Sequence, residues 1–137
     1  MKKVFYLILL LTLCQVGQIN AHKFEKTSLG GIYEVNGVDI EVQFYTPSIV
    51  RIIKAPKGRA YEKKSLSVIA NPQQVIFTSH KSGKNIRLES DQLRIIIDQC
   101  SGVVSFYTKK GKKLLLEKSA AIFTDFNDAG MKTFSVY

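Results

Sequence analysis

The sequence has no tryptophan and only two cysteines, and each shortage excludes a class of structure or site. Cys14 lies in an apolar N-terminal run, which leaves Cys100 without a partner in the remaining chain. The domain must therefore be stabilised by packing and not by disulfides, and Cys100 is expected to be a small buried apolar side chain. The two histidines, His22 and His80, are far apart and have no metal-ligand spacing, so no metal site is predicted.

Signatures of catalysis and of cofactor binding are also missing. The sequence has no Gly-x-Ser-x-Gly motif, and Gly30-Gly31 is not followed by the Lys-Ser/Thr pair of a phosphate-binding loop. A glycosidase needs two carboxylates, one as acid and one as nucleophile or base. The candidates are turn-type aspartates for which no partner can be identified, namely Asp91, Asp98, Asp125 and Asp128. The chain alone is therefore predicted to have no catalytic residues and no cofactor.

The N-terminus has the layout of a secretory signal peptide. Lys2 and Lys3 precede an unbroken apolar run from Val4 to Leu13, and small or polar residues then lead to Ala21. The run is too short for a membrane span, which needs about 20 apolar residues. We expect residues 1–21 to be removed, residues 22–137 to form one domain, and the protein to be periplasmic or extracellular. Lipid attachment at Cys14 is the alternative.

Negative charge is scarce: the formal net charge is +9, and only two of the 20 basic side chains lie in the predicted signal peptide. A basic surface can meet nucleic acid, anionic lipid or acidic glycans. The charges are, however, scattered singly along the predicted strands and turns. The densest group, Lys109 to Lys113 around Gly111, is typical of a solvated hairpin tip. Together with export, this distribution argues against nucleic acid as a partner.

From residue 22 onward the dominant hydrophobic period is two, and no helical stripe is present. Val38 to Phe44 alternates apolar and polar residues strictly, which is typical of a strand with one buried face. Turn signals separate further strands, which are predicted over residues 49–53, 65–69, 75–79, 85–89, 93–98, 103–108, 114–117, 121–126 and 133–137. Strands that recur about every ten residues indicate an all-β fold, a sandwich or a barrel.

Three tyrosines are candidates for sugar stacking. Carbohydrate-binding modules often place a pyranose ring on an exposed aromatic side chain, and Tyr45, Tyr61 and Tyr107 are the residues that could serve here. Outward tyrosines are also ordinary on strands, because tyrosine favours β structure. Tryptophan, the strongest stacking residue, is absent. A free-standing carbohydrate-binding module and a structural β-sandwich of the cell envelope both stay open as alternatives.

The order of several segments resembles the N-terminal domain of glycoside hydrolase family 31, the family of α-glucosidases and α-xylosidases. The segment from Val42 to Ile52 resembles the start of that domain, in which a strand, a short turn and an Ile-Val-Arg-Val type strand follow one another. Leu66-Ser67-Val68 resembles the next segment. Residues 93–98, 101–107 and 111–115 are similar to the meander that follows. The resemblance covers residues 31 to 126, and the signal peptide ahead of it is similar to secreted Bacteroidetes enzymes of this family.

The resemblance implies an antiparallel β-sandwich of the galactose-mutarotase-like kind. In the family this domain packs on a (β/α)8 barrel, and one of its loops helps to shape the pocket for an α-linked oligosaccharide. The segment Asp125-Phe126-Asn127-Asp128 and the residues up to Met131 are the candidate for such a loop. The family's two catalytic aspartates lie in the barrel, and its tryptophan-containing nucleophile motif is absent here. No catalytic residue is therefore carried over.

The C-terminus is unusual for a complete domain. The sequence stops at Phe134-Ser135-Val136-Tyr137, inside a predicted strand, and no polar tail follows. We therefore expect an incomplete sandwich whose chain would continue toward the barrel, as the resemblance implies. The predicted function is that of a non-catalytic accessory domain of an exported α-glycosidase.

Overall fold

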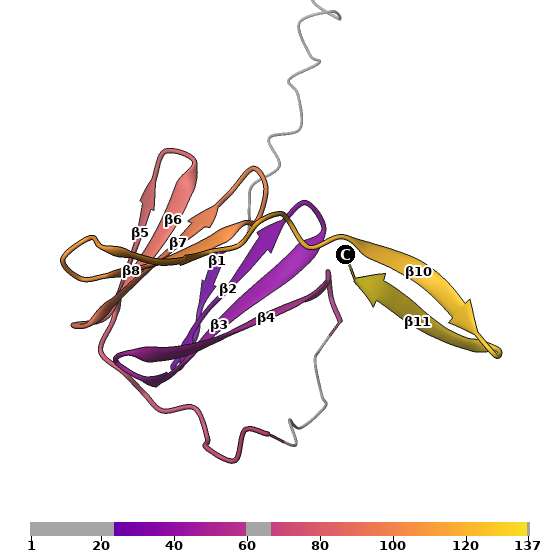
Figure 1. Cartoon of the computed structure of the whole chain (residues 1–137), viewed down its shortest axis with the longest axis horizontal. Coiled ribbons are helices and arrows are strands. Elements are labelled where there is room, and N and C mark those ends of the chain that lie inside the picture. The colour runs from indigo at the N-terminus through magenta and orange to yellow at the C-terminus, as the bar shows by residue number, and fades with distance from the viewer. Residues whose placement is uncertain (1–23, 60–66, 137) are drawn as a thin grey trace, which may run out of the picture.

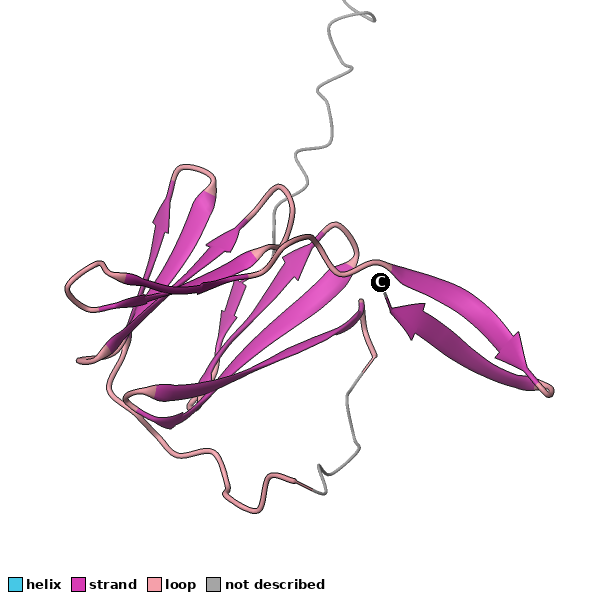
Figure 2. Ribbon diagram, viewed as in Figure 1, coloured by secondary structure: helices cyan, strands magenta, loops and turns pink. Residues whose placement is uncertain are grey.

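The computed structural model describes residues 24–59 and 67–136, with the backbone alone for residues 126, 128 and 131–136. Within these residues every regular element is a strand (Figure 2). The strands are β1 (Phe24–Lys26), β2 (Gly30–Val35), β3 (Val38–Thr46), β4 (Ile49–Pro56), β5 (Thr78–Ser82), β6 (Asn85–Glu89), β7 (Leu93–Asp98), β8 (Val104–Thr108), β9 (Lys113–Leu116), β10 (Phe123–Asp128) and β11 (Met131–Val136). No helix in this part of the chain is long and apolar enough to cross a membrane.

The strands form two antiparallel sheets and a separate hairpin. One sheet has the order β1-β2-β3-β4, the other has the order β5-β6-β7-β8-β9, and β10 pairs only with β11. The two sheets lie face to face, and the hairpin extends away from them (Figure 1). Both sheets are meanders, because each strand pairs with its neighbours in sequence. The predicted all-β antiparallel sandwich is therefore confirmed.

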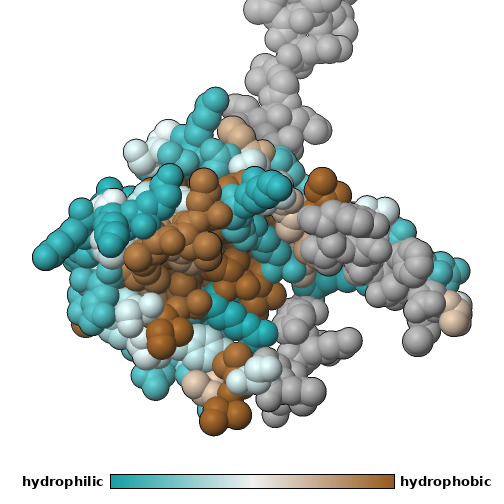
Figure 3. Space-filling model, viewed as in Figure 1, coloured by the Kyte–Doolittle hydropathy of each residue, from teal (hydrophilic) through white to brown (hydrophobic). Residues whose placement is uncertain are grey.

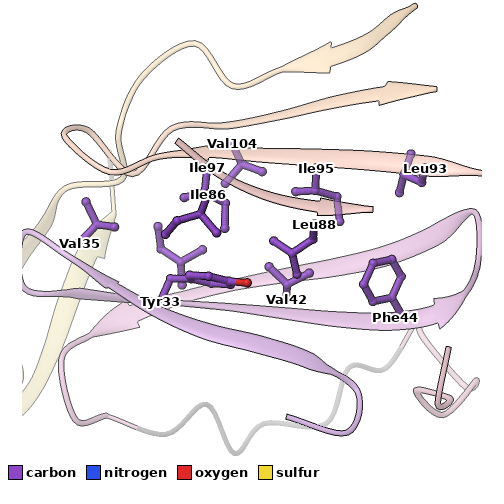
Figure 4. Close-up of a cluster of buried hydrophobic side chains, with 11 residues drawn as sticks. Tyr33, Val35, Val42, Phe44, Ile86, Leu88, Leu93, Ile95, Ile97 and Val104 are labelled. Carbon is purple, nitrogen blue, oxygen red and sulfur yellow. The ribbon is translucent and has the colours of Figure 1, made fainter. Parts of the chain in front are cut away.

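The core lies between the inner faces of the two sheets (Figure 4). Strict alternation in β3 turns Ile40, Val42 and Phe44 inward, and all three are at most 1% exposed. The second sheet contributes Leu88, Ile95, Ile97 and Val104, which are fully buried. Burial of each such side chain stabilises the fold by about 1.5–3 kcal/mol. The period-two pattern of Val38 to Phe44 therefore identified the inner face of β3 correctly.

The hairpin between β2 and β3 was not predicted, although the sequence carries its signal. The turn is Asn36-Gly37, with φ values of 52° and 76°. Asn-Gly with two positive φ angles is the favoured two-residue β-hairpin turn. Tyr33 and Val35 on β2 are each 1% exposed, so this strand supplies part of the core. β1 was missed as well, and its three residues are all exposed.

Two predicted strands differ from the structure. The strand predicted over residues 65–69 is wrong in its described part, since residues 67–69 belong to no strand. β5 begins at Thr78 and not at Val75, and it runs on to Ser82 through the predicted turn. The β5–β6 turn then has only Gly83 and Lys84 between paired Ser82 and Asn85. Gly83 takes the predicted positive φ, 57°.

Contacts between the sheets show which edges face each other. The Tyr33 hydroxyl on β2 lies 3.3 Å from Ser79 Oγ on β5, and Lys26 Nζ on β1 lies 5.1 Å from the centre of the Phe77 ring. At the opposite edges, Lys54 Nζ on β4 forms an ion pair with Glu117 Oε2, just after β9, at 2.5 Å. The edges β4 and β9 therefore lie on the same side of the sandwich.

Tyr33 is expected to make the fold sensitive to alkali. Burial raises the pKa of its hydroxyl from 10.0 to about 12, against a smaller lowering effect of the Ser79 hydrogen bond. The unfolded chain therefore loses this proton before the folded chain does. Stability is fully present below pH 10 and falls by about 2–3 kcal/mol as the pH rises through about 12.

The measurement is urea denaturation from pH 8 to 12 on the wild type and on Tyr33→Phe. The variant should lose about 1 kcal/mol at pH 8 together with the hydrogen bond, but its stability should fall less above pH 10. Tyr107→Phe is the matched control and should keep the alkaline slope of the wild type. Identical slopes for all three proteins would contradict the assignment.

Candidate functional site

A pocket lies where the β10–β11 hairpin leaves the sandwich. Its volume is about 410 Å³, and its wall combines the β2–β3 turn, the end of β4, the β7–β8 turn and the segment leading into β10. The lining residues are Val35, Asn36, Gly37, Val38, Ile40, Lys54, Pro56, Ser101, Gly102, Ala120, Ala121, Ile122, Phe123 and Asp125. Most of these side chains are apolar, so the polar groups that could orient a ligand are few.

The β7–β8 turn in this wall is held by Asp98. Its Oδ1 accepts hydrogen bonds from the Ser101 backbone N–H at 2.7 Å, from Ser101 Oγ at 2.9 Å and from the Cys100 N–H at 2.9 Å. The backbone bond from Ser101 contributes most to lowering the pKa of the Asp98 carboxyl. This is the turn role that the sequence indicates for an aspartate at a strand end. Asp98 is therefore a structural residue of the wall.

The two turns of the wall are joined directly. Asn36 Nδ2 on the β2–β3 turn donates a hydrogen bond of 2.6 Å to the Cys100 carbonyl on the β7–β8 turn. Gly102, with φ of 72°, packs close to Ile40, since an added Cβ would lie 3.2 Å from Ile40 Cδ1. Cys100 itself is exposed in this turn. The prediction that it is buried is wrong, because Cys100 lies in the turn after β7 and not on the inner face of a strand.

Lys54 is the cation of the pocket wall, and its charge is already compensated. Its Nζ donates to Glu117 Oε2 at 2.5 Å and to the Gly102 carbonyl at 2.9 Å. Glu117 Oε2 also accepts a bond of 2.7 Å from the Val104 N–H. The sequence does not predict this pair. The one hint in the sequence is the period of two: Lys54 lies two and four residues after Ile52 and Val50, on the inward face of β4.

The predicted substrate loop is in fact a strand. Asp125, Phe126, Asn127 and Asp128 lie in β10, and the turn is Ala129-Gly130, with φ values of 49° and 84°. Asp125 and Asn127 are exposed, and Asp125 lies at the pocket. The side chains of Phe126 and Asp128 lie outside the described part of the structure. Asp125 is the one carboxylate among the pocket's described lining residues.

The two candidate tyrosines that the structure describes, Tyr45 on β3 and Tyr107 on β8, lie on different sheets and form no common sugar platform. Tyr45 is only 8% exposed, at an irregularity in β3 between Phe44 and Thr46, and so offers no free ring face. Tyr107 is partly exposed on β8 of the five-stranded sheet, where it pairs with Arg94 on the neighbouring strand β7. Tyr61 lies outside the described residues. The alternation of β3 predicted that the Tyr45 ring points outward into solvent. The ring is buried instead, at a point where β3 is irregular and where the Gln73 N–H donates a hydrogen bond to the Phe44 carbonyl.

Acidic side chains gather on the outer face of the four-stranded sheet, and three of them have local partners. Asp39 Oδ2 accepts from the Gly58 N–H at 2.8 Å, and Glu41 Oε1 accepts from Gln43 Nε2 at 2.7 Å. Glu34 pairs with Lys57 at 2.8 Å, which raises the pKa of Lys57. Among residues 24–59 and 67–136 no group of three or more His, Cys, Asp or Glu could hold a metal. These acids therefore serve turns and strand edges.

Comparison with known proteins connects this architecture to carbohydrate-active enzymes. No protein-family model matches the chain. Over 106 residues, or 77% of the chain, it is 26% identical to "Alpha-glucosidase 2" of Bacillus thermoamyloliquefaciens. The crystal structure of the GH31 α-xylosidase from Xanthomonas citri superposes with a TM-score of 0.72 over 82% of the chain, at 22% identity.

Both relatives are far longer than the matched region. The chain covers 14% of the α-glucosidase and 13% of the α-xylosidase. The match therefore takes in only a small part of either relative, and the shared fold is that of the matching region of the α-xylosidase. The resemblance to glycoside hydrolase family 31 that the sequence predicts is confirmed, in sequence by the α-glucosidase and in fold by the α-xylosidase.

Proposed function

We propose that residues 22–137 are the N-terminal accessory β-sandwich of an exported α-glycoside hydrolase of the α-glucosidase or α-xylosidase type. The observation that carries the proposal is the fold match, which takes in 82% of this chain but only 13% of the α-xylosidase. A region of that size holds the sandwich and leaves most of the enzyme for another domain. In this role the sandwich braces a catalytic (β/α)8 barrel and carries no catalytic residue itself.

The local chemistry supports a non-catalytic role. A retaining glycosidase holds two carboxyl groups about 5 Å apart across the scissile bond. The pocket beside β10 has one carboxylate among its described lining residues, Asp125. Asp98, Asp39 and Glu41 hold turns or neighbouring side chains. No described pair of carboxylates therefore stands ready as acid and nucleophile.

The β10–β11 hairpin is the proposed contact with the barrel and its oligosaccharide. It pairs with neither sheet, and an isolated two-stranded hairpin is at best marginally stable in water. A partner surface would supply the burial that the hairpin lacks. Asp125 and Asn127 are exposed on β10, so they are available to a neighbouring domain or to a sugar hydroxyl at the rim of its pocket.

The purified chain is expected to release no nitrophenol above buffer from aryl α-glucoside or aryl α-xyloside. Its binding to α-linked oligosaccharides, followed by calorimetry, should be weak. The variant Asp125→Asn provides the control for the turnover assay, in which it should match the wild type. Turnover that Asp125→Asn abolishes would contradict the proposal, and tight saturable glycan binding would favour a carbohydrate-binding module instead.

Export is part of the same proposal and has its own measurement. Expressed with residues 1–21 in a Gram-negative host, the protein should be recovered outside the cytoplasm. Intact-mass analysis should show His22 as the first residue, because Ala21 suits the position before the cut. Cys14→Ser should leave that mass and location unchanged. If the wild type carries a diacylglycerol group and Cys14→Ser does not, the protein is lipid-anchored at Cys14 and is not cleaved after Ala21.

A further inference from the structure

The side of the sandwich between β4 and β9 is open. Leu115 on β9 is paired with Phe106, whose neighbour on β7 is the buried inward residue Ile95, so Leu115 belongs to the inner face. It is nevertheless 60% exposed. On the facing edge, Val50 and Ile52 share the inner face of β4 with Lys54 and are only partly buried. Side chains that should lie in the core therefore reach the surface along this edge.

We call this surface the open edge and define it by Val50, Ile52, Phe106 and Leu115. Figure 3 shows a continuous hydrophobic area on this side of the sandwich, between the two sheets. The Lys54–Glu117 pair closes one end of it. By contrast, the opposite edges are joined through Tyr33 to Ser79 and through Lys26 to Phe77. The opening is thus confined to one side.

β9 is also the last strand of its sheet, so one row of its backbone groups has no strand partner among the described residues. Its residues Leu114, Leu115 and Leu116 are 55%, 60% and 51% exposed. A strand edge of this kind pairs readily with another extended chain, and natural proteins usually protect it. An added strand would satisfy the backbone of β9 and cover its leucines in one step.

The charge around β9 selects the kind of strand. Lys110, Lys112 and Lys113 precede the three leucines, and Lys118 follows them; all four are exposed, and none forms an ion pair within the described structure. A second copy of this chain would bring the same lysines together, which is unfavourable. A strand with apolar residues at its centre and acidic residues at both ends would meet apolar surface with apolar surface and positive charge with negative charge.

We propose that the open edge is a docking site for one extended polypeptide segment, apolar in the centre and acidic at both ends, which pairs with β9. This goes beyond the proposed function, because it requires only the sheet edge and does not depend on a glycosidase barrel. The segment acts as a further strand of the five-stranded sheet and completes the cover of the core between β9 and β4.

A labelled peptide, Glu-Glu-Val-Thr-Val-Thr-Val-Glu-Glu, provides the probe, with binding to the purified chain followed by fluorescence anisotropy. Saturable binding is expected, weaker in high salt because the flanking charges are exposed. A peptide with lysine in place of each glutamate should bind at least about tenfold more weakly. Equal binding of the two peptides, or binding of neither, would overturn the proposal.

Two variants locate the site. Leu115→Lys should abolish binding of the acidic peptide, because it places a charge in the apolar centre of the edge. Ile76→Lys is the matched control: Ile76 is 95% exposed but precedes β5, on the other side of the sandwich, and its replacement should leave binding unchanged. Loss of binding in both variants, or in neither, would contradict the assignment.

Hydrogen exchange on the unsubstituted chain keeps the test decisive if Leu115→Lys fails to fold. The acidic peptide should slow exchange of the amides of Leu114 to Leu116 and leave those of β1 unchanged. Protection elsewhere with no effect on β9 would overturn the proposal. Sedimentation of the chain without peptide should show a monomer. A dimer that dissociates in Leu115→Lys would mean that a second copy of the chain occupies the open edge, and it would also overturn the proposal.

Discussion

Replacement of Gly30 by alanine is expected to cost the domain about 3 kcal/mol of folding free energy, the upper end of the range for an overpacked core. A Cβ added at Gly30 would lie 2.0 Å from the carbonyl oxygen of Val42 and 2.9 Å from its carbonyl carbon. Both atoms belong to the backbone of β3, which cannot rotate away as a side chain can. β2 and β3 would have to separate where Gly30 pairs with Gln43.

Urea denaturation measures this loss as a lower transition midpoint at an unchanged slope. Gly58→Ala is the matched control, because a Cβ there meets nothing within 4 Å and only the positive φ of 74° opposes it. That variant should lose about 1 kcal/mol. Equal losses at the two positions would show that strand contact at Gly30 is not the cause.

Loss of either partner of the Lys54–Glu117 pair is expected to cost about 2 kcal/mol. Breaking a fully buried pair costs about 3–5 kcal/mol, and the value here is lower because the Glu117 side chain is 30% exposed. Lys54→Met leaves Glu117 without its cation, and Glu117→Gln leaves the Lys54 charge near the Gly102 carbonyl alone. Each change weakens the link that joins β4 to the segment after β9.

A double-mutant cycle measured by denaturation isolates this pair. The double variant should lose less than the two single losses combined, because once one partner is gone the other makes no pair to lose. The control is the exposed pair Lys57–Glu34, in which the lysine side chain is 63% exposed and Lys57→Met should be nearly neutral. Additive losses at Lys54 and Glu117 would mean that the two side chains act independently.

The local sequence pattern predicted most strands, because a strand with one buried face alternates apolar and polar residues. Val38 to Phe44 and Leu93 to Asp98 are strands in the structure, and the apolar residues on their inner faces belong to the core. β2 was missed because its alternation begins with two glycines, although the Asn36-Gly37 turn marks its end. The segment around Val68 has strand-like composition, but its described residues 67–69 belong to no strand.

The candidate site was less predictable. Asp98 at a strand end indicated a turn carboxylate, and three hydrogen bonds from the turn confirm it. The segment from Asp125 to Asp128 has turn-type residues, yet cross-strand pairing with β11 makes it a strand. The composition of the segment favours a loop, but the tight Ala129-Gly130 turn sets a register in which β10 and β11 pair along their whole length.

The sequence by itself determined the all-β class, the inner face of β3 and the turns at Gly83, Gly102 and Gly111, because these depend on neighbours one to four residues away. Tertiary structure decided what two sheets create when they pack: the burial of Tyr45, the exposure of Cys100, and the approach of Lys54 to Glu117, 63 residues apart. It also decided that Leu115, inward by parity, stays exposed. Alternation along a strand determines which face a side chain lies on, but the side chain is buried only where the opposite sheet covers that face.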